Sequence, residues 1–327
     1  MKKELLEVNE LETSLKIHNS WHPTVEDITF KLNEGEVLGV VGESGCGKSI
    51  MSKSIINLLP EKISKITHGE IIFEGQRIDN FNAKEFNKLR GNDIAMIFQE
   101  PMTALNPVFK IKNQIIENIR IHQRLSKKEA YEKAKDLLTK VGIPRQDEIL
   151  NSYPHQLSGG MRQRVMIAMA ICCSPKLLIA DEPTTALDVT IQAQILELLK
   201  QIQKENNMAI ILITHDLSVV SEFCDKVMVM YAGQIVEYGD LEDIIVRPKH
   251  PYTKKLLNTL PKLDEVKERL DTIEGIVPSI LEFGHNHCRF ANRCSEKIKI
   301  CDKVHPKFMK DKDRLVRCHL YDNKSEG

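Results

Sequence analysis

A short apolar run and the glycine-rich turn after it constrain this chain more than any other stretch. Residues 37–41 read as a buried strand, and residues 42–49 match the spacing G-x-x-x-x-G-K-[ST]. Glycines there let backbone N–H groups point at phosphate oxygens, at the N-terminus of the helix that follows. Lys48 would reach the β- and γ-phosphates of a nucleotide, and the Ser49 hydroxyl would bind Mg²⁺. The predicted nucleotide-binding residues of this loop are Gly42, Ser44, Gly45, Cys46, Gly47, Lys48, Ser49 and Ile50.

The bulk properties indicate a chain of about two domains that works inside the cell. A prior of about 150 residues per domain gives two domains for 327 residues. Lys+Arg and Asp+Glu are both 46, so net charge gives no reason to expect nucleic acid as a partner. We read no signal peptide and no membrane span. In the cytoplasm, the 8 cysteines should stay reduced unless a metal or cluster binds them.

Residues 1–35 are predicted to be β structure, because Ile28, Phe30 and Leu32 alternate with polar residues. We assign Trp21, the only tryptophan, to the loop before this alternating stretch. An aromatic ring shortly before a phosphate loop can stack on adenine, or it can pack at the edge of the domain. The sequence leaves both interpretations of Trp21 open.

Two adjacent carboxylates, Asp181 and Glu182, follow the apolar run at 177–180. Sheets of the α/β type bind ligands at the carboxyl ends of their strands, which is where these side chains are expected. Neighbouring strand residues point to opposite faces, so the two carboxylates must have different tasks. One is expected to hold Mg²⁺, and the other to orient or deprotonate water.

Two further polar residues end apolar runs and are predicted to lie at the expected nucleotide site. Gln99 follows residues 94–98, where it would touch Mg²⁺ or the attacking water, although glutamines also simply end strands. His215 follows residues 209–213, and at the same sheet edge we expect it to contact the γ-phosphate.

The middle of the chain is predicted to be helical. Apolar residues recur at helical spacing through residues 107–150, which we read as a helical segment inserted between strands. Ser158 then precedes Gly159 and Gly160 as the expected N-cap of another helix, whose first N–H groups are bare. A bare helix N-terminus is an anion site. Because the chain already has a phosphate loop, a second phosphate site suggests a ligand that two chains share.

These motifs occur in the order of the ATP-binding cassette (ABC) ATPases, which the chain resembles over about 175 residues. The resemblance implies an α/β P-loop cassette with an N-terminal antiparallel β subdomain and a helical subdomain at about 100–172. It also implies a head-to-tail dimer, with two ATP molecules sandwiched between the loop of one subunit and the Ser-Gly-Gly stretch of the other. The implied roles are Glu182 as general base, Asp181 on Mg²⁺, His215 on the γ-phosphate, Gln99 sensing Mg²⁺ and the membrane partner, Ser158, Gly160 and Gln163 on the ATP of the other subunit, and Asp188 at the dimer seam.

A narrower resemblance, to the dipeptide and oligopeptide importer ATPases, covers nearly the whole chain. It is carried by residues 153–165, 180–189, 250–253 and 273–278. The signature motif that contains Met161 resembles that of the D-type subunit. The D-type subunit pairs with a related F-type subunit or, when isolated, with itself. The resemblance implies a cassette at 1–240 and an extension at 241–327. It places the protein on the cytoplasmic face of the membrane with two permease subunits and, indirectly, an extracytoplasmic solute-binding protein.

Other functions stay open at this stage. Importers of nickel and other small solutes share the subfamily, so the resemblance leaves the transported solute open. An alternative function is that of a soluble cassette ATPase that acts on nucleic acid or in translation. The zero net charge and the sequence at 250–253 argue against this alternative. A non-hydrolysing regulatory cassette is disfavoured by Glu182 and His215.

Four cysteines crowd the last 40 residues, where disulfides are disfavoured by the compartment. They are Cys288, Cys294, Cys301 and Cys318, and their gaps exceed those of short zinc knuckles. The tail also resembles that of peptide-importer ATPases, some of which carry a 4Fe–4S cluster. We favour this cluster, with Zn²⁺ or no metal as alternatives. Nearby histidines could serve as zinc ligands, namely His285, His287, His305 and His319. Nearby arginines could offset the charge of an anionic cluster, or they could form an ordinary basic surface, namely Arg289, Arg293, Arg314 and Arg317.

Overall fold

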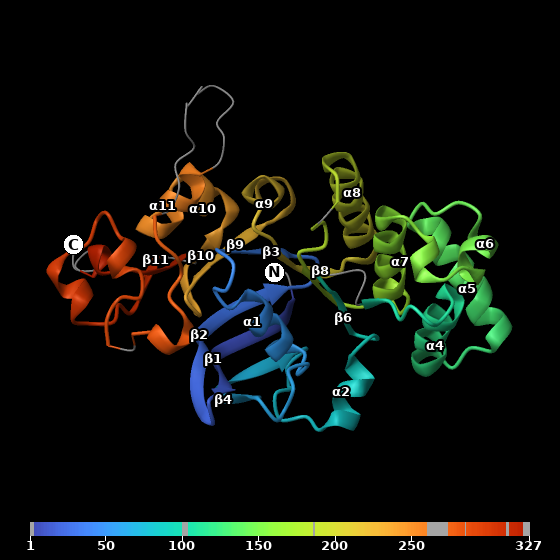
Figure 1. Ribbon diagram of the computed structural model, residues 1–327, viewed down its shortest axis with the longest axis horizontal. Coiled ribbons are helices and arrows are strands. Elements are labelled where there is room, and N and C mark those ends of the chain that lie inside the picture. The colour runs from blue at the N-terminus through green and yellow to red at the C-terminus, as the bar shows by residue number, and fades with distance from the viewer. Residues whose placement is uncertain are drawn as a thin grey trace. The chain divides into compact units, whose positions relative to one another are not determined.

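A computed structural model describes residues 3–99, 104–185, 187–259, 274–284, 286–311 and 314–322. The chain forms two compact units, which can be followed by colour in Figure 1. The first unit contains residues 1–5, 33–36 and 80–213. The second unit contains residues 6–32, 37–79 and 214–327.

The first unit alternates strands and helices. Its strands are β6 (Ile94–Ile97), β7 (Leu177–Asp181) and β8 (Ala209–Ile213). Its helices are α2 (Ala83–Leu89), α4 (Ile111–Gln123), α5 (Lys127–Lys140), α6 (Gln146–Asn151), η1 (Pro154–Gln156), α7 (Gly159–Ile171) and α8 (Val189–Asn206).

The strands of the first unit are parallel, in the order β8-β7-β6. Leu177 of β7 pairs with Ala209 on one side and with Ile94 on the other. Every residue of β7 and β8 is buried, as their uninterrupted apolar runs predict for a parallel sheet. The register places the carboxyl ends of all three strands at one edge, where the predicted polar residues follow.

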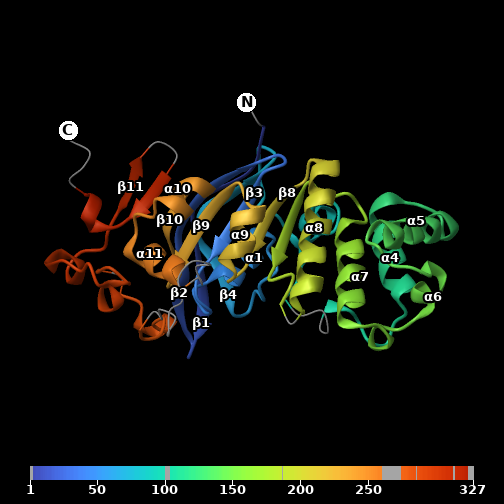
Figure 2. The same cartoon turned by 90° about the horizontal axis from the view of Figure 1, so that it is seen from above.

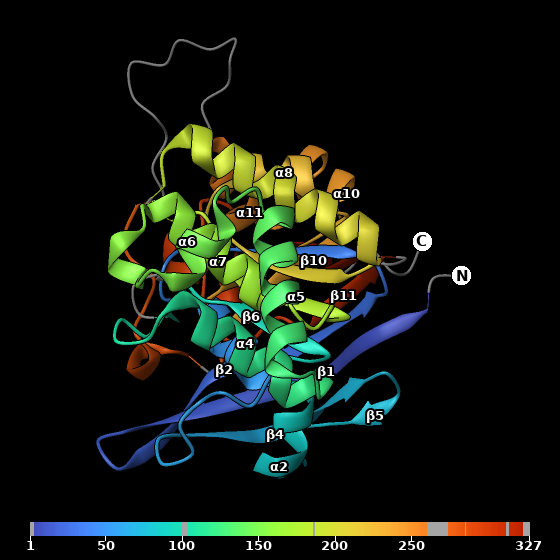
Figure 3. The same ribbon diagram turned by 90° about the vertical axis from the view of Figure 1, so that its right-hand side faces the viewer.

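The helices α4 to α7 form the predicted helical segment, seen from its outer side in Figure 3. Their apolar stripes are buried, which confirms the helical spacing read from the sequence. Helix α5 begins with a capping box, in which Ser126 and Glu129 satisfy each other's backbone N–H groups. Helices α7 and α8 lie side by side in Figures 1 and 2. Arg164 of α7 donates to Gln194 Oε1 of α8 at 3.0 Å.

The second unit contains the remaining elements. Its strands are β1 (Glu4–Ile17), β2 (Ser20–Asn33), β3 (Val37–Val41), β4 (Ser64–Phe73), β5 (Gln76–Arg77), β9 (Lys226–Tyr231), β10 (Gln234–Asp240), β11 (Phe308–Asp311) and β12 (Arg314–Arg317). Its helices are α1 (Lys48–Ile55), α9 (Leu217–Phe223), α10 (Leu241–Val246), α11 (Pro251–Asn258), η2 (Ile280–Glu282), η3 (Ala291–Arg293), η4 (Lys299–Asp302) and η5 (His319–Tyr321).

The N-terminal sheet has the order β2-β1-β4-β5 and confirms the β structure predicted for residues 1–35. The position of Trp21 was predicted wrongly, because this residue lies in β2 and not in a loop. His18 and Asn19 both have positive φ, +47° and +66°, which is the geometry of a tight hairpin turn. The turn therefore ends before Ser20, and Trp21 becomes the second residue of the strand.

The C-terminal extension supplies two strands to the sheet that contains β3. The order in the second unit is β11-β12-β10-β9-β3, with β9 parallel to β3 and the other pairs antiparallel. Glu237 of β10 pairs with Val316 of β12. The extension thus continues the same layer as the strand that leads into the phosphate loop.

The side chains of four arginines of the extension are buried, so the alternative of an ordinary basic surface is wrong. Their side chains are 2–7% exposed, and each contacts a carboxylate from residues 1–240. A buried guanidinium needs such a partner, because desolvating an unpaired charge is costly. The pairs are Arg289–Glu26, Arg293–Glu43, Arg314–Glu237 and Arg317–Asp27.

A buried aromatic cluster joins β9 to the extension. The ring centroids of Tyr231, Tyr252 and Phe290 lie 4.8–5.4 Å apart. His250 borders this cluster as the N-cap of α11, where its Nδ1 accepts from the backbone N–H of Tyr252 at 3.0 Å. Complete burial lowers the pKa of His250 from 6.5 to about 3.

Acid should therefore destabilise the fold through His250. In the unfolded chain the imidazole gains a proton below pH 6.5, whereas in the fold it stays neutral until about pH 3. The unfolded state binds more protons across this window, so stability falls as pH falls, by about 1–2 kcal/mol between pH 6.5 and about 5. His250→Asn keeps an N-cap acceptor without this titration. Thermal unfolding followed against pH should show a shallower acid slope in H250N, and equal slopes would contradict the assignment.

Candidate nucleotide site

The phosphate loop leaves β3 through glycines that no other residue could replace without strain. Gly42 has φ +152°, and a Cβ on it would lie 2.3 Å from the carbonyl oxygen of Met230. Gly47 has φ +103° and forms the N-cap of α1 without a side-chain acceptor. Helix α1 therefore begins at Lys48 with no side chain capping its first N–H groups, which is the arrangement that binds phosphate.

Lys48 is buried within this loop. Its Nζ donates to the carbonyl oxygens of Gly42 and Glu43, at 2.7 and 3.0 Å. Cys46 Sγ lies 3.7 Å from the same ammonium group. Burial raises the pKa of the Cys46 thiol despite the nearby lysine, so Cys46 remains a neutral lining residue. The loop thus presents one cation and a helix N-terminus to an anion.

Residues far along the sequence also hold the phosphate loop, and the motif gave no sign of them. The backbone N–H of Glu43 donates to Tyr252 Oη at 2.9 Å. The Glu43 carboxylate accepts two hydrogen bonds from Arg293, each at 2.9 Å. Tyr252 falls within the phrase at 250–253 that indicated a peptide importer, and Arg293 lies between two of the tail cysteines.

His215 belongs to the same unit as the loop and is exposed after β8. The backbone N–H of Thr214 donates to the carbonyl oxygen of Val40 at 3.2 Å. This bond ties the residue before His215 to the strand that enters the loop. Trp21, also in this unit, is 38% exposed and has Lys65 Nζ 4.4 Å from its ring centroid.

In the first unit, the structure brings Gln99 and Glu182 into contact. Gln99 Nε2 donates to Glu182 Oε2 at 3.0 Å, and the Thr185 hydroxyl donates to the same oxygen at 2.9 Å. Asp181 is the last residue of β7 and is buried. Glu182 has a positive φ of +48°, so the chain turns out of the strand at this residue. The two carboxylates therefore occupy different environments, as expected.

The Ser-Gly-Gly stretch opens α7 in the first unit. Ser158 is its N-cap, and the Oγ atom accepts from the backbone N–H of Met161 at 3.3 Å, which confirms the capping prediction. Gly160 packs closely, since a Cβ on it would lie 3.1 Å from Ile191. Gln163 is buried and donates to the carbonyl oxygen of Pro183, directly after Glu182. Asp188 caps α8 from an exposed position, accepting from the N–H of Ile191 at 2.9 Å.

The tail cysteines share one neighbourhood. The backbone N–H of Cys288 donates to the carbonyl oxygen of Cys301 at 2.9 Å. Burial, with a smaller effect of the other cysteines, raises the pKa of Cys288 to about 11 and that of Cys318 to about 12. Among the described residues, no group of three or more His, Cys, Asp or Glu side chains is arranged to hold a metal ion.

Two of the histidines weighed as zinc ligands have other partners. His305 hydrogen-bonds Gln234 at 2.9 Å, and His319 contacts Asp322 and the carbonyl oxygen of Val304. His285 lies outside the described residues, as does Ile273 of the 273–278 phrase. The described helices include none that is long and apolar enough to cross a membrane.

Comparison with known proteins agrees with this site. The ABC transporter family matches residues 25–185, and the family described as oligopeptide/dipeptide transporter, C-terminal region, matches residues 236–301. Dipeptide transport ATP-binding protein DppD of Bacillus subtilis is 46% identical over 99% of this chain and 97% of its own length. Oligopeptide transport ATP-binding protein AppD of the same organism is 49% identical over 97% of each chain.

Solved structures give the same fold. The dimeric structure of a bacterial ABC transporter cassette matches with a TM-score of 0.65 and 26% identity, over 72% of this chain and 99% of that chain. CbiO1 of Clostridium perfringens, part of an ABC transporter complex, matches with a TM-score of 0.63 and 27% identity, over 75% of this chain and 92% of that chain. The chain therefore belongs to the ABC transporter family, among the ATP-binding proteins that carry the C-terminal region of oligopeptide and dipeptide transporters.

Proposed function

We propose that this chain is the ATP-hydrolysing subunit of an importer of dipeptides or oligopeptides. The observation that carries the proposal is the pairing of a complete phosphate loop with near full-length similarity to peptide transport ATP-binding proteins. The match at 236–301 favours peptides over nickel, because this region is described for oligopeptide and dipeptide transporters. It also supports our division of the chain into a cassette at 1–240 and an extension at 241–327.

Hydrolysis requires positioning of the phosphates and activation of water. The N–H groups of the loop at 42–49 and the Lys48 ammonium group would bind the phosphates. Ser49, Asp181 and Gln99 offer oxygen ligands of the kind that Mg²⁺ prefers, and the ion would neutralise phosphate charge. Glu182 would accept the proton of the attacking water, while Gln99 and Thr185 hold its carboxylate in place. His215 would contact the γ-phosphate, and Trp21 remains our proposal for adenine stacking.

The ATP site is completed by a second cassette in this proposal. Ser158 and Gly160 open α7 with an exposed helix N-terminus, which would bind the phosphate held by the partner, with Asp188 at the seam. Gln163 would act with them by fixing the start of this helix. One related cassette is a dimer in two solved structures, one of which is a post-hydrolysis state bound to ADP and Pi. We propose an F-type homologue as the partner, with two permease subunits at the cytoplasmic face of the membrane.

We further propose that Cys288, Cys294, Cys301 and Cys318 bind a 4Fe–4S cluster, with Zn²⁺ as the alternative. The donor set fits, because four thiolates suffice for either group. The backbone N–H groups of Phe290, Glu296 and Leu320 act to lower the pKa values of Cys288, Cys294 and Cys318, against the larger effect of burial. Binding would require the four Sγ atoms to turn toward one another.

Replacement of Glu182 tests the hydrolytic step. In Glu182→Gln the amide cannot accept the proton of water, so kcat should fall by about 100-fold or more. Binding of ATP should persist, and gel filtration with ATP should show a trapped dimer of the variant. Glu197→Gln, which changes an exposed glutamate of α8, is the matched control. Wild-type turnover in E182Q would remove Glu182 from the role of base.

The metal proposal is tested by analysis of anaerobically purified protein. About four iron and four sulfide per chain are expected. Cys301→Ser should lower both, whereas Cys173→Ser, in the first unit, should not. Raised thiol pKa values mean that binding must release protons, so occupancy should fall as pH is lowered. Stoichiometric zinc without iron would replace the cluster by the zinc alternative, and absence of both would refute metal binding.

Uptake by intact cells tests the transported solute. Deletion of the gene should abolish uptake of labelled di- and oligopeptides, and expression of the wild-type chain should restore it. Lys48→Ala should fail to restore uptake, because it removes the loop cation. Uptake of labelled nickel should be unchanged by the deletion. Loss of nickel uptake with normal peptide uptake would transfer the proposal to a metal importer.

A further inference from the structure

The side chain of Glu43 places a negative charge in the loop that must bind phosphates. Glu43 directly follows Gly42, and its carbonyl oxygen accepts from Lys48 Nζ at 3.0 Å. The position of this one residue therefore affects both the charge of the loop and the placement of its lysine. An unpaired carboxylate here would repel the phosphates of ATP.

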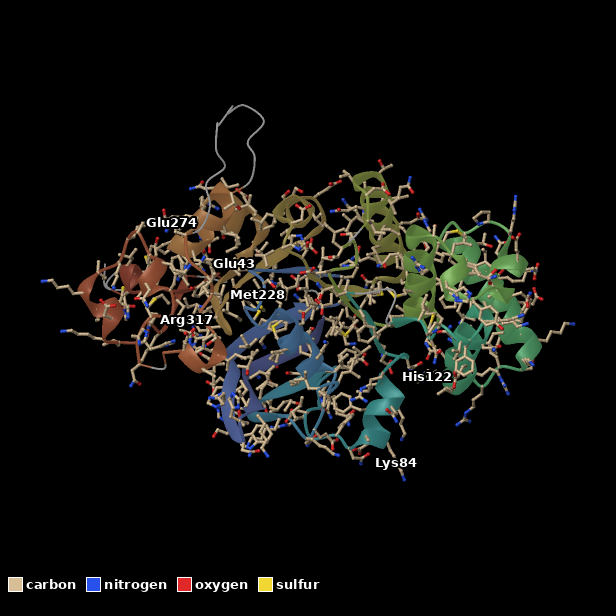
Figure 4. The ribbon with its side chains drawn as sticks, in the orientation of Figure 1. Glu43, Lys84, His122, Met228, Glu274 and Arg317 are labelled. Atoms are coloured by element: carbon tan, nitrogen blue, oxygen red, sulfur yellow. The ribbon has the colours of Figure 1, made fainter. Side chains whose placement is uncertain are left out.

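Arg293 neutralises that carboxylate in a fixed geometry. Both carboxylate oxygens of Glu43 accept from the guanidinium group at 2.9 Å, and the arginine side chain is buried. The three remaining N–H groups donate to the carbonyl oxygens of Glu274 and Gly275, at 2.9 and 3.2 Å, and to Tyr231 Oη, at 3.4 Å. Figure 4 labels Glu43 and Glu274, which both accept hydrogen bonds from this guanidinium group. A lysine could not make this set of contacts, because it lacks the planar fork.

The segment that carries Arg293 is the one that carries the cysteines. Arg293 ends η3 and directly precedes Cys294. Its carbonyl oxygen accepts from Lys255 Nζ at 2.8 Å, and the N–H of Ala291 donates to the carbonyl oxygen of Cys288 at 3.0 Å. A change in the backbone around Cys288 and Cys294 would therefore move the guanidinium group relative to the phosphate loop.

We propose that Arg293 is a positioning residue of the phosphate loop, which makes the affinity for ATP depend on the cysteine-bearing segment of the extension. The proposal rests on the ATP binding proposed above. By reciprocity, bound ATP favours the ordered form of this segment. The folded state of the extension thereby affects the affinity of the nucleotide site for ATP.

The test is a double-mutant cycle on the purified full-length protein, with the dissociation constant of Mg-ATP measured by calorimetry. Arg293→Gln should bind ATP about tenfold more weakly, because Glu43 is left unpaired. In a Glu43→Gln background the same substitution should cost less than about threefold, since the repelling charge is gone. Arg293→Lys should fall between wild type and R293Q. The KM for ATP should rise in R293Q with little change in kcat.

Cys294→Ser should follow the same pattern, with weaker ATP binding that Glu43→Gln largely relieves. Arg247→Gln is the matched control, because it breaks an exposed pair with Asp243 in the same extension but outside the segment that carries Cys288 and Cys294. Thermal unfolding of each variant shows whether it is folded. Equal affinity of R293Q and wild type, or an equal loss in both backgrounds, would overturn the proposal. If the wild type binds ATP no better than K48A, the proposed function itself fails.

Discussion

The turn from β3 into α1 is the constraint on which the rest of the structure depends. A phosphate loop needs backbone N–H groups that face inward, and Gly42 provides this only with a φ that other residues avoid, directly against the Met230 carbonyl oxygen. That contact exists because β9 pairs with β3 in parallel register, with Val40 beside Met228. Strands β10 and β12 pair successively beyond β9, so the extension supports the sheet from which the loop emerges.

The attachment of the extension is electrostatic as well as apolar. Four buried arginines pair with carboxylates of the N-terminal sheet, the phosphate loop and β10. Buried ion pairs add little net stability compared with apolar packing, but removal of one partner leaves a desolvated charge. Such pairs therefore determine how the extension is attached more than they increase the stability of the attachment. The aromatic cluster around Tyr252 supplies the apolar contact that these pairs orient.

Local chemistry made much of this predictable from the sequence. Apolar runs identified the buried strands, and two of the polar residues that follow these strands, Gln99 and Glu182, are in contact. Ser158 was recognised as an N-cap because capping acts within one helical turn. Trp21 was misplaced because the turn at His18 and Asn19 carries no glycine. The arginine pairs could not be predicted for another reason. They join residues separated by up to 290 positions in the sequence, and no local sequence pattern indicates contacts over such a separation.

The division between predicted and unpredicted residues follows the division of tasks. Residues that touch phosphate, Mg²⁺ or water must have particular chemistry at particular spacing, so the sequence displays them. Residues that hold the loop from outside need only the correct charge at the correct place in space, which many sequence positions can supply. Arg293 is of this second kind, since its fork is useful only because β9, α11 and η3 bring it to Glu43. A cassette can therefore keep its motifs unchanged while an extension alters how tightly the loop binds.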